Sequence, residues 1–305
     1  MPFDLLERRF LALTPHPGPL ARASVALLEA AGSGIWVSVD HVEGSAPREL
    51  GAGMLVTAEA VLGSVGGGNL EWQAIEKSRA MLKTDEGQDR QEACVEQAEW
   101  ALGPGLGQCC GGRVRLSFER LSRRSGGVRL RQALEEPHVH LAVFGAGHVG
   151  MALSSALAPL PFRVTMVDSR AEALQPMAVQ AGLSDGRLQL DHEEQPHSAV
   201  PSLPSGGGVL VMTHSHAQDF DIVLACLERQ RSQGDLPWLG LIGSRSKWRG
   251  FASRLRERGF GPDLLNQVQC PVGLTSQIQG KAPAVIAASV TAQLLSLHPS
   301  HAVAP

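Results

Sequence analysis

A glycine-rich segment, LAVFGAGHVG, contains Gly145, Gly147 and Gly150 in the spacing G-x-G-x-x-G. In dinucleotide-binding proteins the first glycine allows a tight turn, the second lets a phosphate approach the backbone, and the third lets the next helix pack closely. That helix, predicted over 151–157, would offer backbone N–H groups and a positive dipole end to an anion. Asp168 follows 23 residues after Gly145, where a carboxylate would meet a ribose hydroxyl. The spacing therefore predicts a site for a phosphate-containing ligand.

A second glycine-rich junction, Gly66-Gly67-Gly68-Asn69, lies between a predicted short strand and a predicted helix over 70–82. Asn69 is a residue type that often forms the N-cap of a helix. The three glycines could simply form a tight turn with positive φ, and we favour this interpretation. The alternative is a second loop that binds an anion, in which these four residues would contact a cofactor.

Two adjacent cysteines, Cys109 and Cys110, lie between Gly107 and the pair Gly111-Gly112. Adjacent cysteines rarely form a disulfide with each other, because one peptide supplies too short a Cα separation. They could be two small apolar residues at the start of a strand. We favour a functional interpretation, since flanking glycines expose the sulfurs and nearby backbone N–H groups favour thiolate. Both cysteines are thus candidate ligands of a soft metal, or partners in sulfur transfer.

Two more polar clusters follow predicted buried strands. The first is His214-x-His216-x-x-Asp219, and the second contains Ser244 and Arg245. The His-x-His spacing is similar to that of di-metal hydrolases, but the acid comes one residue late and a phenylalanine replaces the final histidine, which disfavours that function. Asp219 could instead cap the following helix, while the histidines line a crevice or contact a ligand directly.

The elements that must position these residues divide the chain into two predicted domains. Residues 1–121 alternate strands and helices and indicate an α+β domain, and polar residues over 122–137 indicate a linker. Residues 138–305 predict a Rossmann-like, doubly wound parallel sheet, with strands over 141–144, 164–167, 209–212 and 238–242. Because ligands bind outside the carboxyl ends of parallel strands, the glycine turn and the two later clusters should converge on one crevice.

Composition excludes several classes of protein. The chain has 305 residues, 43% hydrophobic residues and a formal net charge of −3, which disfavours a general nucleic-acid binder. No apolar run is long enough to span a membrane, and the start of the chain lacks the apolar region of a signal peptide. Five cysteines do not indicate a disulfide framework. We therefore expect a cytoplasmic protein without nucleic-acid or membrane partners.

The chain resembles the XdhC/CoxI family of xanthine dehydrogenase accessory proteins. The matching segments span nearly the whole chain, and the one around the two cysteines is the most specific. They are Gly44–Arg48, Gly63–Trp72, Leu102–Gly112, Phe144–Gly150, Thr213–Asp219, Leu241–Arg245, Cys270–Leu274 and Pro283–Ala287. Two departures are Asn69, where a histidine is common, and the absence of an acid soon after Leu274.

The resemblance implies a chaperone that binds molybdenum cofactor, a molybdopterin, and is not itself a catalyst of turnover. Such proteins protect the cofactor, support its sulfuration with a cysteine desulfurase, and deliver it to the molybdenum subunit of xanthine dehydrogenase. The cofactor's phosphate would suit the turn at Gly145–Gly150 or Arg245, and its metal end would suit Cys109 or Cys110. This implies a site between the domains, and we also expect a homodimer.

Three other functions remain open at this stage. The Rossmann-like domain could serve an NAD(P)-dependent oxidoreductase, which would need a proton donor such as His148 or His214. The histidine cluster could hold zinc in a metal hydrolase. A protein that binds no small molecule would be an interaction scaffold. A nucleotide could also occupy the Rossmann site of a molybdopterin carrier.

Overall fold

The computed structural model describes residues 13–17, 19–84, 95–103, 111–124, 126–184 and 186–297. The chain forms two compact units. One comprises residues 16–136, and the other comprises residues 137–305 together with residues 1–15. The segment 122–137, which the sequence predicts as a linker, contains a helix and belongs almost entirely to the first unit. The boundary between the units therefore lies later in the chain than residue 121.

The first unit is built on a five-stranded sheet in which β2 and β6 pair along ten residues. All strand pairs in it are antiparallel, and the strand order is β4-β3-β2-β6-β5. The strands are β2 (Ser33–Glu43), β3 (Gly53–Val56), β4 (Val61–Gly63), β5 (Val95–Ala101) and β6 (Arg113–Ser122).

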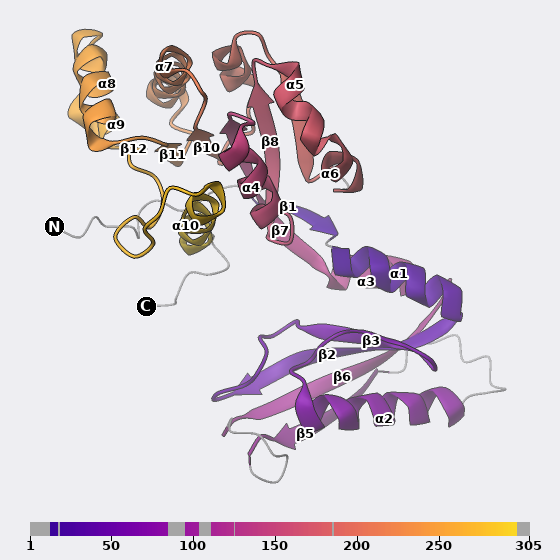
Figure 1. The fold of residues 1–305 in the computed structure, drawn as a ribbon. Helices are drawn as coiled ribbons and strands as arrows, with labels where there is room; N and C mark the ends of the chain where they lie inside the picture. The colour runs from indigo at the N-terminus through magenta and orange to yellow at the C-terminus, as the bar shows by residue number, and fades with distance from the viewer. Residues whose placement is uncertain are drawn as a thin grey trace. The chain divides into compact units, whose positions relative to one another are not determined.

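Helices cover both faces of this sheet (Figure 1). They are α1 (Pro19–Ala31), α2 (Gly68–Thr84) and α3 (Gly126–Ala133). Successive residues of β2 point to opposite faces, so Ile35 and Val37 pack in the cluster that includes Leu70 of α2, whereas Trp36 packs with Leu28 of α1. Over residues 34–37, β2 is therefore buried on both faces of the sheet.

The second unit contains a parallel sheet in the order β12-β11-β10-β7-β8-β9, with β1 (Leu13–Pro17) paired to β7 outside this series. Its strands are β7 (Glu135–Phe144), β8 (Phe162–Asp168), β9 (Leu188–His192), β10 (Gly208–Val211), β11 (Trp238–Leu241) and β12 (Val268–Gln269). If β7 is counted as strand 1 and the sheet is read from β9 to β12, the strand order is 3-2-1-4-5-6, as in dinucleotide-binding sheets. The predicted fold class, an α+β region followed by a Rossmann-like parallel sheet, is confirmed.

Helices lie on both faces of the parallel sheet, as a doubly wound fold requires. Side chains of α4, α10 and the α5–α6 segment form one apolar cluster, and those of α7, α8 and α9 form the other. The sheet therefore separates two cores and leaves its carboxyl edge to the loops. The helices are α4 (His148–Leu157), α5 (Ala171–Leu174), η3 (Gln175–Met177), α6 (Ala178–Leu183), η4 (Pro196–Ser202), α7 (His216–Gln233), α8 (Arg245–Glu257), α9 (Pro262–Leu265) and α10 (Pro283–Ser296).

Several elements were not predicted from the sequence. They are β1, β5, α3, the α5–α6 segment, β9, η4, α9 and β12. β5 is an edge strand whose residues are largely exposed, so apolar alternation gave no signal there. None of the helices within the described residues is long and apolar enough to cross a membrane.

Candidate functional site

The turn from β7 to α4 has the geometry that its glycine spacing predicts. Gly145 has φ +118, and a Cβ there would lie 2.4 Å from the carbonyl oxygen of Met212 at the end of β10. A Cβ on Gly150 would lie 2.3 Å from the carbonyl oxygen of Gly145. Gly147, by contrast, is exposed and would place a Cβ in open space. Gly145 and Gly150 thus allow close packing, whereas Gly147 leaves the start of α4 accessible to a ligand.

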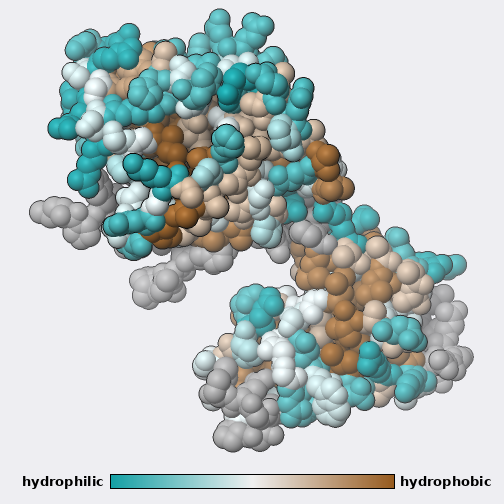
Figure 2. Space-filling view, viewed as in Figure 1, coloured by the Kyte–Doolittle hydropathy of each residue, from teal (hydrophilic) through white to brown (hydrophobic). Residues whose placement is uncertain are grey.

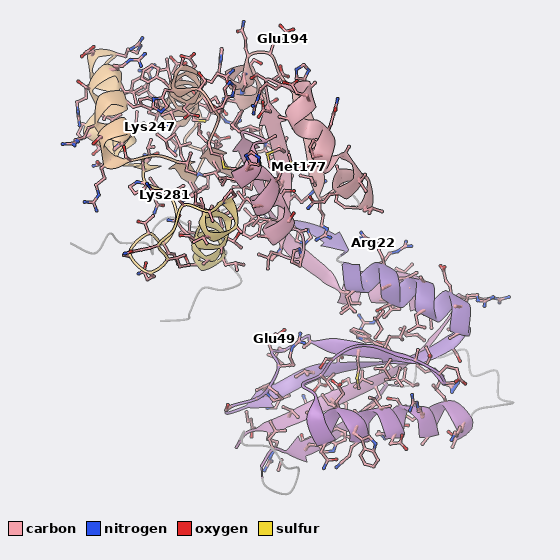
Figure 3. All side chains as sticks on the ribbon, viewed as in Figure 1. Arg22, Glu49, Met177, Glu194, Lys247 and Lys281 are labelled. Atoms are coloured by element: carbon pink, nitrogen blue, oxygen red, sulfur yellow. The ribbon has the colours of Figure 1, made fainter. Side chains whose placement is uncertain are left out.

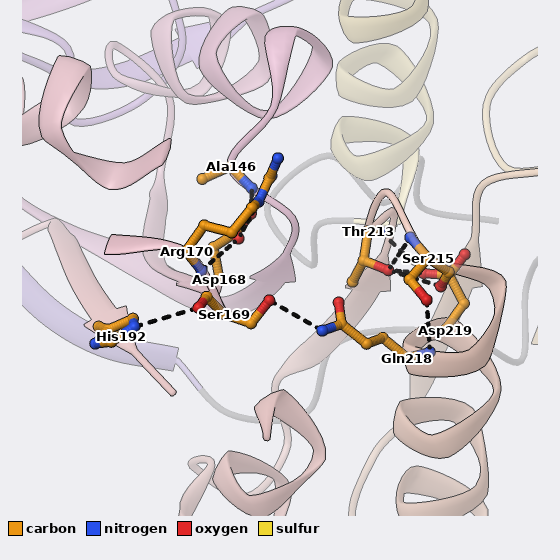
Figure 4. A network of polar contacts seen from close by, with 9 residues as sticks. All are labelled: Ala146, Asp168, Ser169, Arg170, His192, Thr213, Ser215, Gln218 and Asp219. Atoms are coloured by element: carbon orange, nitrogen blue, oxygen red, sulfur yellow. Dashed lines mark hydrogen bonds and ion pairs between the residues drawn. The ribbon is translucent and has the colours of Figure 1, made fainter. Parts of the chain in front are cut away.

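Asp168, at the end of β8, is not free to bind a ribose. Its side chain is 2% exposed, and its carboxylate accepts a hydrogen bond from the N–H of Ala146 at 2.7 Å. Arg170 donates to the same carboxylate from its backbone N–H at 3.0 Å, from Nε at 2.9 Å and from Nη2 at 2.9 Å. The expected role of Asp168 as a ribose acceptor therefore does not fit this structure, because the carboxylate already binds the turn and the guanidinium (Figure 4).

The ionisation of Asp168 follows from these contacts. Burial of the carboxyl raises its pKa, but the hydrogen bonds from Arg170 and from the backbone N–H groups of Ala146 and Arg170 outweigh burial. The pKa of Asp168 accordingly lies below its ordinary value. The Arg170–Asp168 pair is therefore charged on both sides at neutral pH.

The loop after β10 leads into α7 through a dense set of hydrogen bonds. Asp219 is fully buried, and its Oδ1 accepts hydrogen bonds from the N–H of Thr213 at 2.9 Å and from Thr213 Oγ1 at 2.7 Å. Its Oδ2 accepts from Lys247 Nζ at 2.5 Å, and Nζ also donates to the carbonyl of Ile242 at 2.9 Å. Lys247 lies near the start of α8 (Figure 3). This buried ion pair joins the starts of α7 and α8.

These contacts correct the expectation that Asp219 caps α7, since the N-cap is Ser215, whose hydroxyl accepts from the N–H of Gln218. His214 and His216 are exposed, whereas Asp219 is 0% exposed and bound to its neighbours. Within the described residues, no group of three or more His, Cys, Asp or Glu side chains is placed to hold a metal ion. The metal-hydrolase alternative thus lacks a ligand set at this position.

Loops from different strands meet at the carboxyl edge of the sheet. Gln218 Nε2 donates to Ser169 Oγ at 2.9 Å, which links the start of α7 to the end of β8 (Figure 4). Ser244 forms the N-cap of α8 by accepting from the N–H of Lys247 at 3.2 Å, and Arg245 beside it is exposed. The structure therefore brings the glycine turn, the histidine loop and the Ser244–Arg245 loop to one edge of this sheet.

The glycine turn of the first unit is occupied by the chain's own carboxylate. Glu71 Oε2 accepts hydrogen bonds from Ser64 Oγ at 2.5 Å and from the N–H groups of Val65 and Gly67, each at 3.1 Å. Gly66, Gly67 and Gly68 all have positive φ, at +132, +74 and +62. The favoured interpretation, a tight turn that requires glycine, fits this geometry, and the groups that would bind an external anion already bind Glu71.

Asn69 is not the N-cap that its residue type suggests. Helix α2 begins one residue earlier, at Gly68, and Asn69 Oδ1 accepts a weak hydrogen bond of 3.4 Å from Gln73 Nε2 on the next turn. Asn69 is exposed, so its side chain is accessible at the start of the helix. The acceptor at this helix start is Glu71, whose carboxylate reaches back to the N–H groups that precede the helix.

Cys109 and Cys110 lie outside the described residues, on the connection between β5 and β6. The base of that connection is closed by a hydrogen bond of 2.7 Å from the N–H of Leu102 to the carbonyl of Gly112. A Cβ on Gly112 would lie 2.4 Å from the carbonyl oxygen of Ser45, and one on Gly66 would lie 2.5 Å from Pro47. The base of the cysteine connection and the glycine turn thus both pack against the loop after β2.

The described cysteines that are free are poor candidates for thiolate chemistry. Burial raises the pKa of Cys226 to about 12 and that of Cys270 to about 11. Both thiols are therefore protonated at neutral pH. The sulfur chemistry that the sequence predicts for Cys109 and Cys110 is therefore not expected of these two thiols.

A cavity of about 510 Å³ lies at the other end of the parallel strands, between α4 and α6. Its lining includes Leu157, Phe162 and Leu188, and the nearby residues Val179 and Leu183 are 75% and 78% exposed. Figure 2 shows an apolar patch over α6, the helix that contains Val179 and Leu183. This cavity contains none of the predicted site residues, so its size does not make it the candidate site.

Sequence reasoning missed two residues that decide how the turns work, Arg170 and Glu71. Arg170 stands two residues after the acid that ends β8, and Glu71 stands in the first turn of α2. An arginine close to the acid that ends a Rossmann strand and a glutamate near a helix N-terminus are both recognisable signals. The sequence could not show which of them would bind the neighbouring groups of the chain.

The comparisons with known proteins agree with this architecture. The model of the XdhC Rossmann domain matches residues 141–294, and that of the XdhC and CoxI family matches residues 27–97. YqeB of Escherichia coli strain K12 is 30% identical over 256 residues, which are 83% of this chain. The chain spans 41% of the length of YqeB.

A solved structure from Bacillus halodurans, described as a xanthine dehydrogenase, has the same fold. It superposes with a TM-score of 0.68 over 90% of this chain and 95% of the other, at 20% sequence identity. At that identity the likeness is one of fold. The Rossmann-domain match, however, covers just over half of the chain and contains the glycine turn, Asp168 and the histidine loop. The chain therefore belongs to the XdhC and CoxI family.

Proposed function

We propose that this protein is an accessory factor that binds molybdenum cofactor, protects it, and delivers it to the molybdenum subunit of xanthine dehydrogenase. Family membership supports the accessory role, and the Bacillus halodurans protein of the same fold is described as a xanthine dehydrogenase. The family also motivates the remaining parts of the proposal: sulfuration with a cysteine desulfurase, a homodimeric state, a cytoplasmic location and no activity of its own in turnover.

One observation carries the proposal for the second unit. The N-terminus of α4 is open at Gly147, beside the point where strand order reverses between β7 and β10. Ligands of doubly wound sheets bind at that point, and the N–H groups of a helix start bind phosphate. The phosphate of the molybdopterin would lie at this turn. Its metal would be bound by Cys109 or Cys110, whose thiolates are soft ligands.

Gly147→Asp tests the phosphate end. Gly147 has φ −73, and a Cβ there meets no atom within 4 Å, so a side chain fits without strain. Aspartate is a good N-cap residue, and the fold should be kept, but its charge repels a phosphate. We expect molybdopterin retention to fall more than about tenfold, whereas the neutral Gly147→Asn control retains most of it. Equal retention by both variants and the parent would show that the phosphate binds elsewhere.

Alanine variants test the metal end. Cys109→Ala, Cys110→Ala and the double variant are purified with the cofactor present, and bound molybdenum and pterin are measured. We expect loss of molybdenum in at least the double variant, with the unfolding transition unchanged. If all three variants retain as much cofactor as the parent, the thiolate role is wrong.

A nicotinamide titration separates the proposal from the alternative of an NAD(P)-dependent oxidoreductase. The strand order supports that alternative, but Asp168 has no free acceptor for a ribose. We expect no micromolar binding of NADH. Micromolar binding, together with reduction of an added substrate, would favour the oxidoreductase.

A further inference from the structure

The guanidinium of Arg170 has unused donors beside the glycine turn. Arginine carries five side-chain N–H donors, and the described contacts of Arg170 use one on Nε and one on Nη2, both toward Asp168. The outer edge of the guanidinium, with Nη1 and the second hydrogen of Nη2, has no recorded acceptor among the described residues. The side chain is 35% exposed. It therefore presents a fixed, accessible edge of N–H donors, on a guanidinium that also interacts electrostatically with the carboxylates of Asp168 and Glu172.

Asp168 has the complementary property of being fully used. Its Oδ1 accepts from the N–H and Nε of Arg170, and its Oδ2 accepts from the N–H of Ala146 and from Arg170 Nη2. A carboxylate offers about four acceptor positions, and all are taken. A ribose diol could bind Asp168 only by displacing a buried, charge-assisted pair. The carboxylate thus orients Arg170 and does not read a hydroxyl.

The guanidinium also lies next to the open helix start. Arg170 Nη2 and the N–H of Ala146 share one oxygen atom of Asp168, and Figure 4 shows the side chain of Arg170 beside Ala146. Gly147, the next residue, is exposed and leaves space where a side chain would stand. A cation and the positive end of α4 therefore flank the same small space, and both favour an anion.

We infer that Arg170 binds a phosphate monoester of the ligand at this turn, and that this contact replaces the ribose contact of NAD-binding sites. The inference deepens the proposed function and rests on it for the identity of the ligand, since molybdopterin carries such a phosphate. The guanidinium edge offers two parallel N–H groups to two phosphate oxygens, a geometry that a hydroxyl cannot match. Arg170 is then the residue that sets the preference of the site for phosphorylated ligands.

The test compares ligands that differ by one phosphate. A fluorescent pterin with a phosphate monoester on its side chain is titrated against the full-length protein, and so is the same pterin after phosphatase treatment. The parent should bind the phosphorylated form about 10- to 100-fold more tightly, as expected for charge-assisted hydrogen bonds. In Arg170→Met this ratio should fall to a few-fold, and Arg170→Lys should restore part of it. Arg256→Met, which removes an exposed arginine from the far end of α8, should leave the ratio unchanged.

NADP⁺ and NAD⁺ form a second pair that does not depend on the pterin. The parent should prefer NADP⁺ by about tenfold or more, and Arg170→Met should lose this preference. If Arg170→Met keeps the parent's ratio for the two pterins, the inference is wrong while the proposed function stands. If the parent binds neither pterin, the proposed function fails and the nucleotide pair decides. In that case the inference is wrong if the protein binds neither nucleotide, or if its preference for NADP⁺ over NAD⁺ does not depend on Arg170.

Discussion

The two glycine-rich junctions of this protein have similar sequences and opposite local outcomes. In each, a strand ends in glycines and a helix follows, and in each a carboxylate of the chain accepts hydrogen bonds from the turn. In the first unit Glu71 comes from the helix itself and takes the N–H groups of Val65 and Gly67. In the second unit Asp168 comes from the end of the next strand and accepts a hydrogen bond from one N–H group of the turn, that of Ala146. The start of α4 is left open at Gly147.

The position of the acid explains the difference. A glutamate in the first turn reaches back over the helix start and occupies the place of an external anion. An aspartate at the end of a neighbouring strand binds the turn from the side, and its charge is balanced by Arg170. A glycine-rich strand-to-helix junction therefore predicts anion binding only where the chain does not supply the anion itself.

The largest expected effect is a loss of stability on breaking the Lys247–Asp219 ion pair, at the same edge of the parallel sheet as the turn at Gly145–Gly150. Lys247→Met leaves the carboxylate of Asp219 buried without its cation, because Asp219 is 0% exposed and Lys247 Nζ lies 2.5 Å from it. We expect the free energy of unfolding to fall by about 3 to 5 kcal/mol, measured by urea denaturation. The double variant Asp219→Asn/Lys247→Met should recover part of this loss, since no charge is left unpaired. A single variant as stable as the parent would show that the pair does not support this edge.

Gly150→Ala should break the open turn itself. The added Cβ would meet the carbonyl oxygen of Gly145 at 2.3 Å, a backbone atom that cannot move without shifting the turn. We expect a loss of about 1 to 3 kcal/mol in unfolding free energy and a loss of ligand retention. Gly147→Ala is the matched control, because its Cβ enters open space and its φ is −73. Equal stability of the two variants would contradict the packing role of Gly150.

Glu71→Ala sharpens the comparison from the other side. It removes the acceptor of three hydrogen bonds, so the unfolding free energy should fall by about 1 to 3 kcal/mol. Glu76→Ala, on the exposed face of the same helix, should cost no more than about 0.5 kcal/mol. Added phosphate should raise the melting temperature of Glu71→Ala more than that of the parent. Equal protection of both proteins by phosphate would mean that Glu71 does not fill this turn.

The smallest effect is a pH dependence. Because the folded-state pKa of Asp168 lies below its ordinary value of 3.8, its charged form stabilises the fold above about pH 4. That contribution is lost as the pH falls through the folded-state pKa. Asp168→Asn should therefore be less stable than the parent at pH 7, and the difference should narrow below pH 4 in urea denaturation. A difference that stays constant with pH would show that the carboxylate charge plays no part.

The sequence by itself determined the fold of the second unit and the location of its candidate site. The spacing of Gly145, Gly147 and Gly150 after a short apolar run, and the later strands that end in polar clusters, follow from local periodicity and turn chemistry. Short or polar elements such as β5 and β9 were not predicted, because their place in a sheet depends on neighbouring strands and not on their own sequence pattern.

Only the tertiary structure decided which groups at the two turns are free. Asp168 and Arg170 are two residues apart, and the side chain of either could have faced solvent. The pairing of β7 with β8 brings the N–H of Ala146 to Asp168. The carboxylate is thereby held between the glycine turn and the guanidinium of Arg170. In the same way, Lys247 removes Asp219 from the predicted ligand cluster by reaching it from another helix. The sequence specifies every hydrogen-bond donor and acceptor, but their pairing depends on distances that arise when strands far apart in the chain lie side by side.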